Sequence, residues 1–154
     1  MVKNLLKKNE KRRKNNKGFS LVELIVVIAI MAVLVGVLAP QLIKYVERSR
    51  CSTDMQNLQQ IKSAVEVYYA DNDESGAFSL TAAAGTKTTT IKLNNDETKG
   101  QKVLKNAGLS TTFSLKSSKW GAISMVYTPG NDDPWAISGT ATISGKEYNI
   151  ADLK

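Results

Sequence analysis

The spacing of apolar and polar residues changes along the chain, and the first segment to stand out is almost wholly apolar. Between residues 19 and 39, Ser20 and Glu23 are the only strongly polar residues. At a rise of about 1.5 Å per residue, a helix over this run would be roughly 31 Å long, which matches the hydrocarbon core of a bilayer. Residues 19–39 are therefore predicted to form a transmembrane helix.

Beyond the apolar run the pattern becomes one-sided. Apolar residues recur at intervals of three or four, at Met55, Leu58, Ile61, Val65 and Tyr68. This spacing marks one face of an α-helix, with polar residues filling the other faces. We therefore predict a single long helix over residues 19–72. Its first half is apolar on every side, and its second half, residues 40–72, is amphipathic.

Residues 73–154 carry shorter patterns, which predict a small head with three or four antiparallel strands. Residues 73–90 are rich in turn-forming and small residues, and they are predicted to form a loop. A short helix is predicted over 96–109, ending near Gly108. Strands are predicted over 88–93, 111–115, 119–128 and 134–143, with 146–150 as a hairpin partner across Ser144–Gly145.

A head of about 80 residues without disulfides can bury little core by itself. We therefore expect its sheet to pack against the amphipathic half of the long helix. Four large side chains are then expected in the core or at contacts between molecules: Trp120, Met125, Tyr127 and Trp135. The predicted fold class is α+β, with one long N-terminal helix packed on a small antiparallel sheet.

The net charge of +7 arises entirely at the start of the chain. Residues 1–18 contain eight basic residues and one acidic residue, whereas residues 19–154 contain 13 of each. Because the rest of the chain is neutral, a nucleic-acid partner is not expected. A basic leader before a transmembrane helix instead predicts a cytoplasmic N-terminus, with the following residues translocated.

Two simpler interpretations compete for the leader and the apolar run. A cleaved secretory signal would place its cleavage site near Ala39, which leaves Pro40 as a poor first residue, and the run is long for a signal core. A plain uncleaved signal anchor accounts for the leader and the run. It does not account for Glu23, which lies a short distance after Gly18.

Glu23 is a candidate functional residue because a carboxylate within a transmembrane segment is costly and needs a partner. The apolar run contains no basic residue, so Glu23 is predicted to be unpaired in the precursor. A cut between Gly18 and Phe19 would create an α-amino group four residues before Glu23, on the same helix face. That amine could pair with Glu23 of its own chain or of a neighbouring copy.

The stretch GFSLVELIVVIAIMAVLVGVLAP resembles the N-terminal class III signal of type IV prepilins and related pseudopilins. The residues that carry the resemblance are the basic leader ending in Gly18, then Phe19 and Glu23, and the apolar helix that reaches Pro40. The resemblance covers about residues 10–70 and implies a type IV pilin-like fold. Many heads of this family carry a C-terminal disulfide loop, and this sequence departs from that pattern, since Cys51 is its one cysteine.

The resemblance implies that a prepilin peptidase cleaves after Gly18, removing residues 1–18, and N-methylates Phe19. Glu23 would pair with the N-terminal amine of an adjacent subunit during assembly. The precursor would be a single-pass protein of the bacterial cytoplasmic membrane, and the mature subunit would enter an extracellular or envelope filament. The implied partners are the peptidase, other copies and minor pilins, the inner-membrane assembly platform and the lipid bilayer.

Gly36 and Pro40 are predicted to weaken the long helix. Proline lacks an N–H and crowds the carbonyl four residues earlier, which here belongs to Gly36, and glycine itself is a poor helix former. One interpretation is a static kink. The other, which the resemblance favours, is a segment that unwinds inside the filament.

The function that follows is a structural subunit of a type IV pilus. The alternatives are a pseudopilin of a type II secretion system and a pseudopilin of a competence DNA-uptake machine. The N-terminal signal is common to all three, so it does not separate them.

The remaining chemistry of the sequence is sparse. The chain has no histidine, no phosphate-binding glycine loop and no catalytic constellation, so neither an enzyme nor a cofactor is expected. The oxygen ligands of Asn131, Asp132 and Asp133 could hold calcium, but without an alternating ligand pattern a solvated turn is the favoured interpretation. Cys51 is either a packed residue or a surface thiol.

Overall fold

The computed structural model describes residues 18–153, which divide into two compact units with a boundary between Gln41 and Leu42. The basic leader predicted over residues 1–18 lies outside the described residues, apart from Gly18 itself. The second unit contains the head together with the helical segment that packs against it.

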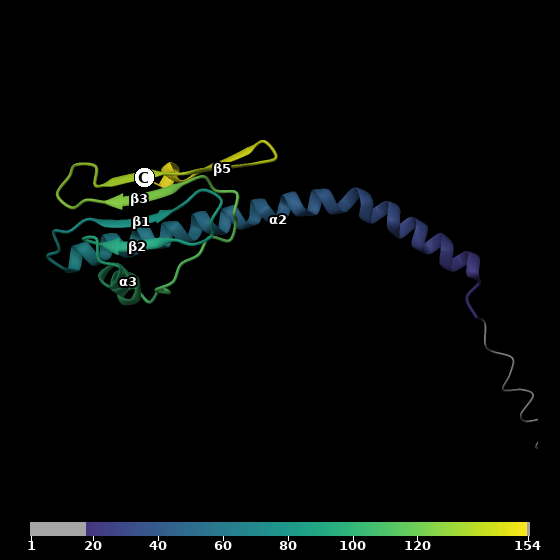
Figure 1. Cartoon of the computed structure of the whole chain (residues 1–154), viewed down its shortest axis with the longest axis horizontal. Helices are drawn as coiled ribbons and strands as arrows, with labels where there is room; N and C mark the ends of the chain where they lie inside the picture. The colour runs from purple at the N-terminus through teal and green to yellow at the C-terminus, as the bar shows by residue number, and fades with distance from the viewer. Residues whose placement is uncertain (1–17, 154) are drawn as a thin grey trace, which may run out of the picture. The chain divides into compact units, whose positions relative to one another are not determined.

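The long helix predicted over residues 19–72 is present as α2, Leu21–Asp71, with 51 residues (Figure 1). The prediction is confirmed to within two residues at each end. At the C-terminal end, the amide N–H of Asn72 donates to the carbonyl of Tyr68 at 3.0 Å, and its side-chain Nδ2 donates to the same carbonyl at 2.9 Å. These bonds satisfy a carbonyl that the helix would otherwise leave unpaired.

Pro40 lies inside α2, and the helix continues on both sides of it. Its ring removes one backbone hydrogen bond at Gly36, where an added Cβ would meet no atom within 4 Å. The kink and the unwinding of residues 36–40 in a filament both remain predictions.

In the second unit, α2 buries one face along its length. The buried residues follow one another at helical spacing: Cys51, Asp54, Leu58, Ile61, Ala64 and Val65. The predicted stripe is therefore confirmed at its centre, while Met55 and Tyr68 are only partly buried at its edges. The stripe begins earlier than predicted, at Cys51, and it also includes the carboxylate of Asp54.

The head contains a four-stranded antiparallel sheet in the order β2-β1-β3-β4 (Figure 1). Its strands are β1 (Phe78–Ala82), β2 (Thr90–Leu93), β3 (Ile123–Tyr127) and β4 (Trp135–Ser138). The register pairs Phe78 with both Leu93 and Tyr127, and Tyr127 with Trp135, so these four residues form a row across one end of the sheet.

The prediction that residues 73–90 form a loop is wrong, because they contain β1, one of the two central strands. Phe78, Leu80 and Ala82 alternate inward and are buried, while Ser79 and Thr81 face outward. Small and polar residues surround this short alternation in the sequence, and its strand conformation depends on pairing with β2 and β3 on either side.

Two further strand predictions need correction. Residues 111–115 do not form a strand, and Ser114 makes only an isolated bridge with Thr88. The strand predicted over 134–143 is broken at Gly139 into β4 and β5 (Thr140–Ile143). Gly139 has φ 147°, and a Cβ there would lie 2.9 Å from the side chain of Ile150, so this bend requires glycine.

The hairpin predicted across Ser144–Gly145 is confirmed as β5 paired with β6 (Lys146–Asn149). Both turn residues have positive φ, 51° at Ser144 and 79° at Gly145, which is the combination that a two-residue hairpin turn of type I′ requires. A short 3-10 helix, η2 (Ile150–Leu153), follows β6.

The short helix predicted over 96–109 is confirmed as α3, Glu97–Asn106. Asp96 caps its N-terminus, and its carboxylate accepts hydrogen bonds from the amides of Thr98 and Lys99 at 2.8 and 3.2 Å. Gly100 lies against β2, where an added Cβ would come within 2.7 Å of the Lys92 backbone. Glycine therefore permits the close packing of α3 on the edge of the sheet.

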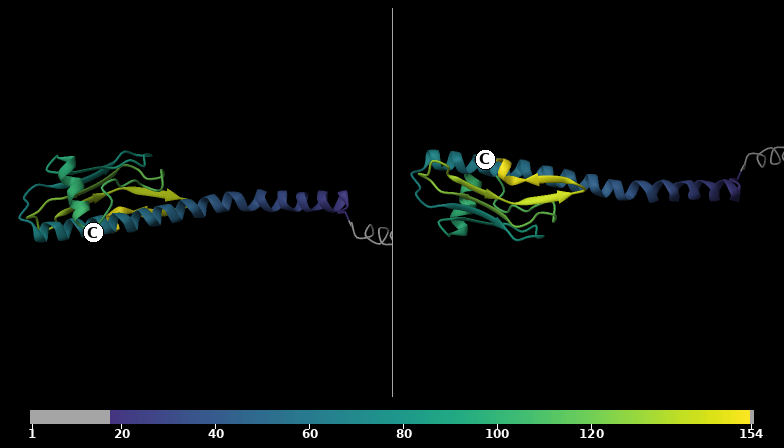
Figure 2. Two further views of the ribbon diagram at one scale, coloured as in Figure 1. Left: turned by 90° about the horizontal axis from the view of Figure 1, so that it is seen from below. Right: turned by 90° about the horizontal axis from the view of Figure 1, so that it is seen from above.

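The core lies between the sheet and the second half of α2, which run side by side in both views of Figure 2. Trp120, Met125 and Trp135 are buried in it, and Tyr127 packs against it. The prediction that these residues form core is confirmed, and the helix supplies the apolar surface that the small head lacks.

Candidate functional site

The peptide bond between Gly18 and Phe19 precedes the first turn of α2. Residues 18–20 are not helical, α2 begins at Leu21, and Phe19 is 92% exposed. A Cβ at Gly18 would meet no atom within 4 Å. The predicted cleavage position is therefore open and outside the helix, which suits a protease that must bind its substrate in an extended conformation.

The carboxylate of Glu23 has a backbone partner in the uncut chain. Its Oε2 accepts a hydrogen bond from the amide N–H of Ser20 at 2.9 Å. Ser20 directly precedes the helix, and Glu23 is the third helical residue, so the pair has the geometry in which a glutamate caps a helix N-terminus. The negative charge also lies at the positive end of the helix dipole.

The prediction that Glu23 is unpaired in the precursor considers only charged partners, whereas this bond gives the carboxylate a neutral backbone donor. It follows from the lack of basic side chains in the apolar run, but every helix start also exposes backbone N–H groups that can serve as donors. The signal is present in the sequence, because Ser20 and Glu23 have the Ser-x-x-Glu spacing of a capping box.

The part of α2 that follows Glu23 exposes apolar side chains on all sides. Leu24, Val33 and Val37 are 61%, 67% and 60% exposed, and none of residues 24–38 is buried. By length and composition α2 could cross a membrane, although a signal sequence near the N-terminus would meet the same criterion. A contiguous apolar surface of this extent marks a site of contact with lipid or with other protein.

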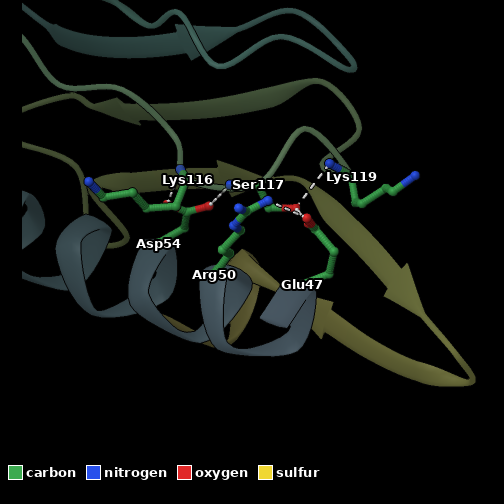
Figure 3. Close-up of polar contacts among 6 residues, drawn as sticks. All are labelled: Glu47, Arg50, Asp54, Lys116, Ser117 and Lys119. Carbon is green, nitrogen blue, oxygen red and sulfur yellow. Dashed lines mark hydrogen bonds and ion pairs between the residues drawn. The ribbon is translucent and has the colours of Figure 1, made fainter. Parts of the chain in front are cut away.

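A second group of polar residues, the Asp54 cluster, joins α2 to the head. It consists of Glu47, Arg50, Asp54, Lys116, Ser117 and Lys119 (Figure 3). Asp54 is fully buried, and its Oδ1 accepts from the amide of Lys116 at 2.7 Å. Its Oδ2 accepts from the amide of Ser117 at 3.0 Å and from the indole Nε1–H of Trp120 at 2.9 Å.

Glu47 extends the Asp54 cluster along α2. Its Oε2 accepts from the Ser117 hydroxyl at 2.9 Å, and its Oε1 pairs with Arg50 Nη1 at 2.5 Å. Ser117 Oγ in turn accepts from the amide of Lys119 at 3.1 Å. Burial alone would raise the pKa of Glu47, but the bond from Ser117 and the charge of Arg50 outweigh it and lower that pKa.

The sequence prediction missed the Asp54 cluster, because the partners of Asp54 lie 62 to 66 residues away along the chain. One signal was available. Asp54 falls on the apolar face of α2, three residues after Cys51 and four before Leu58, and a carboxylate in that position must find donors or remain unsatisfied.

Cys51 is a packed residue. Its side chain is fully buried on the same face of α2 as Asp54, and burial raises the pKa of its thiol. Of the two interpretations that the sequence allows, the structure therefore supports the packed residue and not the surface thiol.

Asn131, Asp132 and Asp133 lie in the exposed loop between β3 and β4. Among residues 18–153, no group of three or more histidine, cysteine, aspartate or glutamate side chains lies close enough to hold a metal ion. A backbone bond from the Thr128 amide to the Pro134 carbonyl at 2.8 Å closes the loop.

Sequence comparisons connect the N-terminal segment with known proteins. The family model described as the prokaryotic N-terminal methylation motif matches residues 13–39. A type IV major fimbrial protein, FimA, of Dichelobacter nodosus is 30% identical over 138 residues, which cover 85% of this chain and 79% of that protein. The matched motif thus contains Gly18, Phe19 and Glu23, and the likeness to FimA covers 85% of the chain, which is long enough to reach into the head.

Two further relatives match over shorter stretches of the chain. A second FimA of Dichelobacter nodosus is 38% identical over 60 residues, which are 39% of this chain and 38% of that protein. The prepilin peptidase-dependent protein A of Clostridium perfringens (strain 13 / Type A) is 38% identical over 66 residues. These residues are 43% of this chain and 47% of that protein, so the chain spans less than half the length of either relative in these matches. No solved structure matches the chain.

Proposed function

The chain belongs to the type IV pilin family, and from this premise we propose that it is a structural subunit of a type IV pilus, made as a membrane-anchored precursor. The observation that carries the proposal is the open Gly18–Phe19 bond directly before a helix whose apolar side chains are exposed on every side. A helix of that kind needs lipid around it in the precursor and other helices around it in the assembled fibre.

We assign cleavage to the bond between Gly18 and Phe19, and methylation to the new amine of Phe19. The mature chain then has 136 residues, which is the full length of 154 less 18. A relative of the chain is named as dependent on prepilin peptidase, and the methylation motif covers both residues. The basic leader keeps the N-terminus in the cytoplasm, where it precedes the transmembrane segment.

Glu23 is proposed to guide assembly through the amine that cleavage creates. Its carboxylate already reaches back to the Ser20 amide, which is one residue after Phe19. After cleavage, the Phe19 ammonium offers a charged donor in place of a neutral one, and charge-assisted hydrogen bonds are about twice as strong. In an apolar environment, pairing with the amine of an adjacent copy removes two isolated charges at once.

The apolar half of α2 is proposed to leave the bilayer and enter the filament core, driven by the assembly platform in the inner membrane. Gly36 and Pro40 lie within α2 at the end of this half, and the missing hydrogen bond at Pro40 provides a place where the helix can unwind as subunits pack. The partners of the mature subunit are other copies of itself and related minor pilins.

The experiment compares Glu23→Gln and Glu23→Ala with Ser20→Ala. Glutamine keeps an oxygen that can accept the Ser20 amide bond but has no charge, whereas Ser20→Ala keeps the backbone N–H itself. We expect both Glu23 variants to insert in the membrane and to be nearly absent from sheared fibres, while Ser20→Ala assembles. Normal assembly of Glu23→Gln would reduce Glu23 to a helix cap and contradict the pairing role.

Electron microscopy with an antibody against the head separates a pilus from the other machines that share this N-terminal signal. Long labelled surface fibres are the expected result. A strain that carries the processed chain in its envelope, lacks fibres and secretes or takes up DNA poorly when the chain is deleted would contradict the pilus assignment.

A further inference from the structure

The charges of the head are separated between its two ends. We define the far end as the end where α2 finishes, and the near end as the end where α2 joins the head at residues 42–50. The sheet register places Phe78, Leu93, Tyr127 and Trp135 in a row at the far end, so the loops beside this row lie there too. The helix reaches the same end, since Glu66 accepts from Trp135 Nε1 at 2.9 Å.

The segments at the far end are acidic. Residues 71–77, 94–97 and 128–134 together contain seven acidic residues and no basic residue. Asp71, Asp73 and Asp132 are exposed, and no side-chain ion pair engages them within residues 18–153.

The C-terminus of α2 adds to this negative end. Asp71 is the last helical residue, and the last turn of α2 holds no basic side chain. The carboxylate therefore lies at the negative end of the helix dipole, where cations are favoured and anions are disfavoured. A cation from another molecule would relieve this repulsion.

The segments at the near end are basic. Residues 42–50, 83–89, 114–120 and 144–147 together contain seven basic residues and two acidic residues. Backbone bonds hold these segments together, including Leu115 N to Lys87 O at 2.8 Å and Gly85 N to Trp120 O at 3.0 Å. Arg48 Nη2 also donates to the Ser144 carbonyl at 3.0 Å, which ties α2 to the hairpin tip.

A groove opens on the near end between α2 and two of these segments. Its volume is about 440 Å³, and its lining includes Arg50 from α2, Lys87 from the loop after β1, and Lys116 from the segment before β3. Arg50 is paired with Glu47, but no ion pair engages Lys87 or Lys116 within the described part of the chain. Two unpaired ammonium groups thus border one depression.

We propose that this basic groove receives the acidic segment 71–74, which begins at the last residue of α2, from a second copy of the chain in the same filament. This contact rests on the proposed function, because only a filament stacks many parallel copies. Parallel heads at the same height would place like-charged ends beside one another, which is repulsive. A copy displaced along the filament axis brings its far end to the near end of its neighbour, where the charges are opposite.

The test is a pair of charge reversals with their combination. Asp71→Lys with Asp73→Lys reverses the acidic end, and Lys87→Glu with Lys116→Glu reverses the groove. Because like charges in contact strongly disfavour an interface, we expect either reversal to lower the sheared-fibre yield at least about tenfold. Combining the two reversals should return the yield to within about twofold of wild type.

The matched control is Lys102→Glu with Lys105→Glu on α3, which changes the net charge as much as reversal of the groove does and alters exposed positions. This variant should assemble like wild type. The contact would be overturned if either single-end reversal assembled fully, or if the combination did not recover the yield. In both cases the wild-type fibres would still support the assignment as a pilus subunit. A wild-type chain missing from all fibres would overturn the proposed function and the contact together.

A crosslink tests the same contact without relying on reversed charges. The variant Asp73→Cys with Lys87→Cys, made together with Cys51→Ser, has one thiol at each end of the head. Because the two ends lie apart in one molecule, a disulfide can form only between copies. Oxidised fibres should give a ladder of multimers on a non-reducing gel, whereas fibres that give monomers alone would contradict the proposal.

Discussion

Removal of the Asp54 carboxylate should loosen the head from α2, and the size of the effect follows from the bonds it accepts. Asp54 accepts three hydrogen bonds, from Lys116 N at 2.7 Å, Ser117 N at 3.0 Å and Trp120 Nε1 at 2.9 Å. A bond to a charged group contributes about 1.5 kcal/mol at the low end of its range, so three contribute about 4.5 kcal/mol. Relief of the cost of burying the carboxylate offsets part of this sum.

We expect Asp54→Ala to lower the free energy of unfolding by about 3 kcal/mol, because three N–H groups lose their acceptor. In a domain of roughly 100 residues, a loss of about 1 kcal/mol in the free energy of unfolding lowers the midpoint Tm by about 4 °C. The Tm of Asp54→Ala should therefore fall by about 12 °C. The assay is thermal unfolding of the full chain in detergent micelles, followed by tryptophan fluorescence, since Trp120 is itself a partner of Asp54.

Two variants calibrate the measurement. Asp54→Asn keeps an oxygen acceptor but places an NH₂ group beside one of the three donors, so its Tm should lie between those of wild type and Asp54→Ala. Asp71→Asn removes a carboxylate from the same helix at an exposed position and should leave Tm nearly unchanged. A Tm for Asp54→Ala equal to that of Asp71→Asn would refute the argument that Asp54 holds the head to α2.

Three further predictions follow from individual residues. Gly100→Ala should destabilise the head by about 1–3 kcal/mol in denaturant unfolding, because the alanine Cβ would meet the Lys92 backbone at 2.7 Å. This loss should outweigh the better helix propensity of alanine. The neighbouring substitution Gln101→Ala should leave the stability nearly unchanged. Burial raises the pKa of Tyr69 from 10.0 to about 12. The stability that the neutral Tyr69 hydroxyl contributes is therefore fully present below pH 10 and is lost as the pH rises to about 12. Between these pH values, the Tm of Tyr69→Phe should fall less than the Tm of wild type. Cys51 is fully buried and burial raises its thiol pKa, so a thiol reagent should label it slowly in intact fibres and rapidly in denaturant.

Each of these three predictions has an outcome that contradicts it. Equal stability of Gly100→Ala and wild type would mean that α3 moves away from β2 at no cost. Parallel pH profiles of wild type and Tyr69→Phe would remove the effect assigned to the tyrosine hydroxyl. Rapid labelling of Cys51 in native fibres would show that the packed face of α2 opens readily.

The elements that were predicted from the sequence are those fixed by local patterns. The apolar run and the recurrence at three or four residues define α2, since both signals lie within the helix itself. The same holds for α3, with Asp96 at its start and Gly108 after its end, and for the hairpin turned by Ser144–Gly145.

The features that were missed depend on residues far apart in the sequence. Strand β1 is built from Phe78, Leu80 and Ala82 within a stretch of small and polar residues, and β2 and β3 pair with it on either side. Asp54 likewise finds its donors more than 60 residues away. The partner of Glu23 was local and was missed for a different reason, because it is a backbone amide instead of a charged side chain.

The central claim is that cleavage between Gly18 and Phe19 turns a membrane-anchored precursor into a filament subunit. Mass spectrometry of the N-terminal peptide from sheared fibres tests it most directly. We expect a chain of 136 residues, the 154 of the precursor less 18, that begins at Phe19 and carries one methyl group on its α-amine. Fibres whose subunits retain the leader, or begin at any residue other than Phe19, would contradict it.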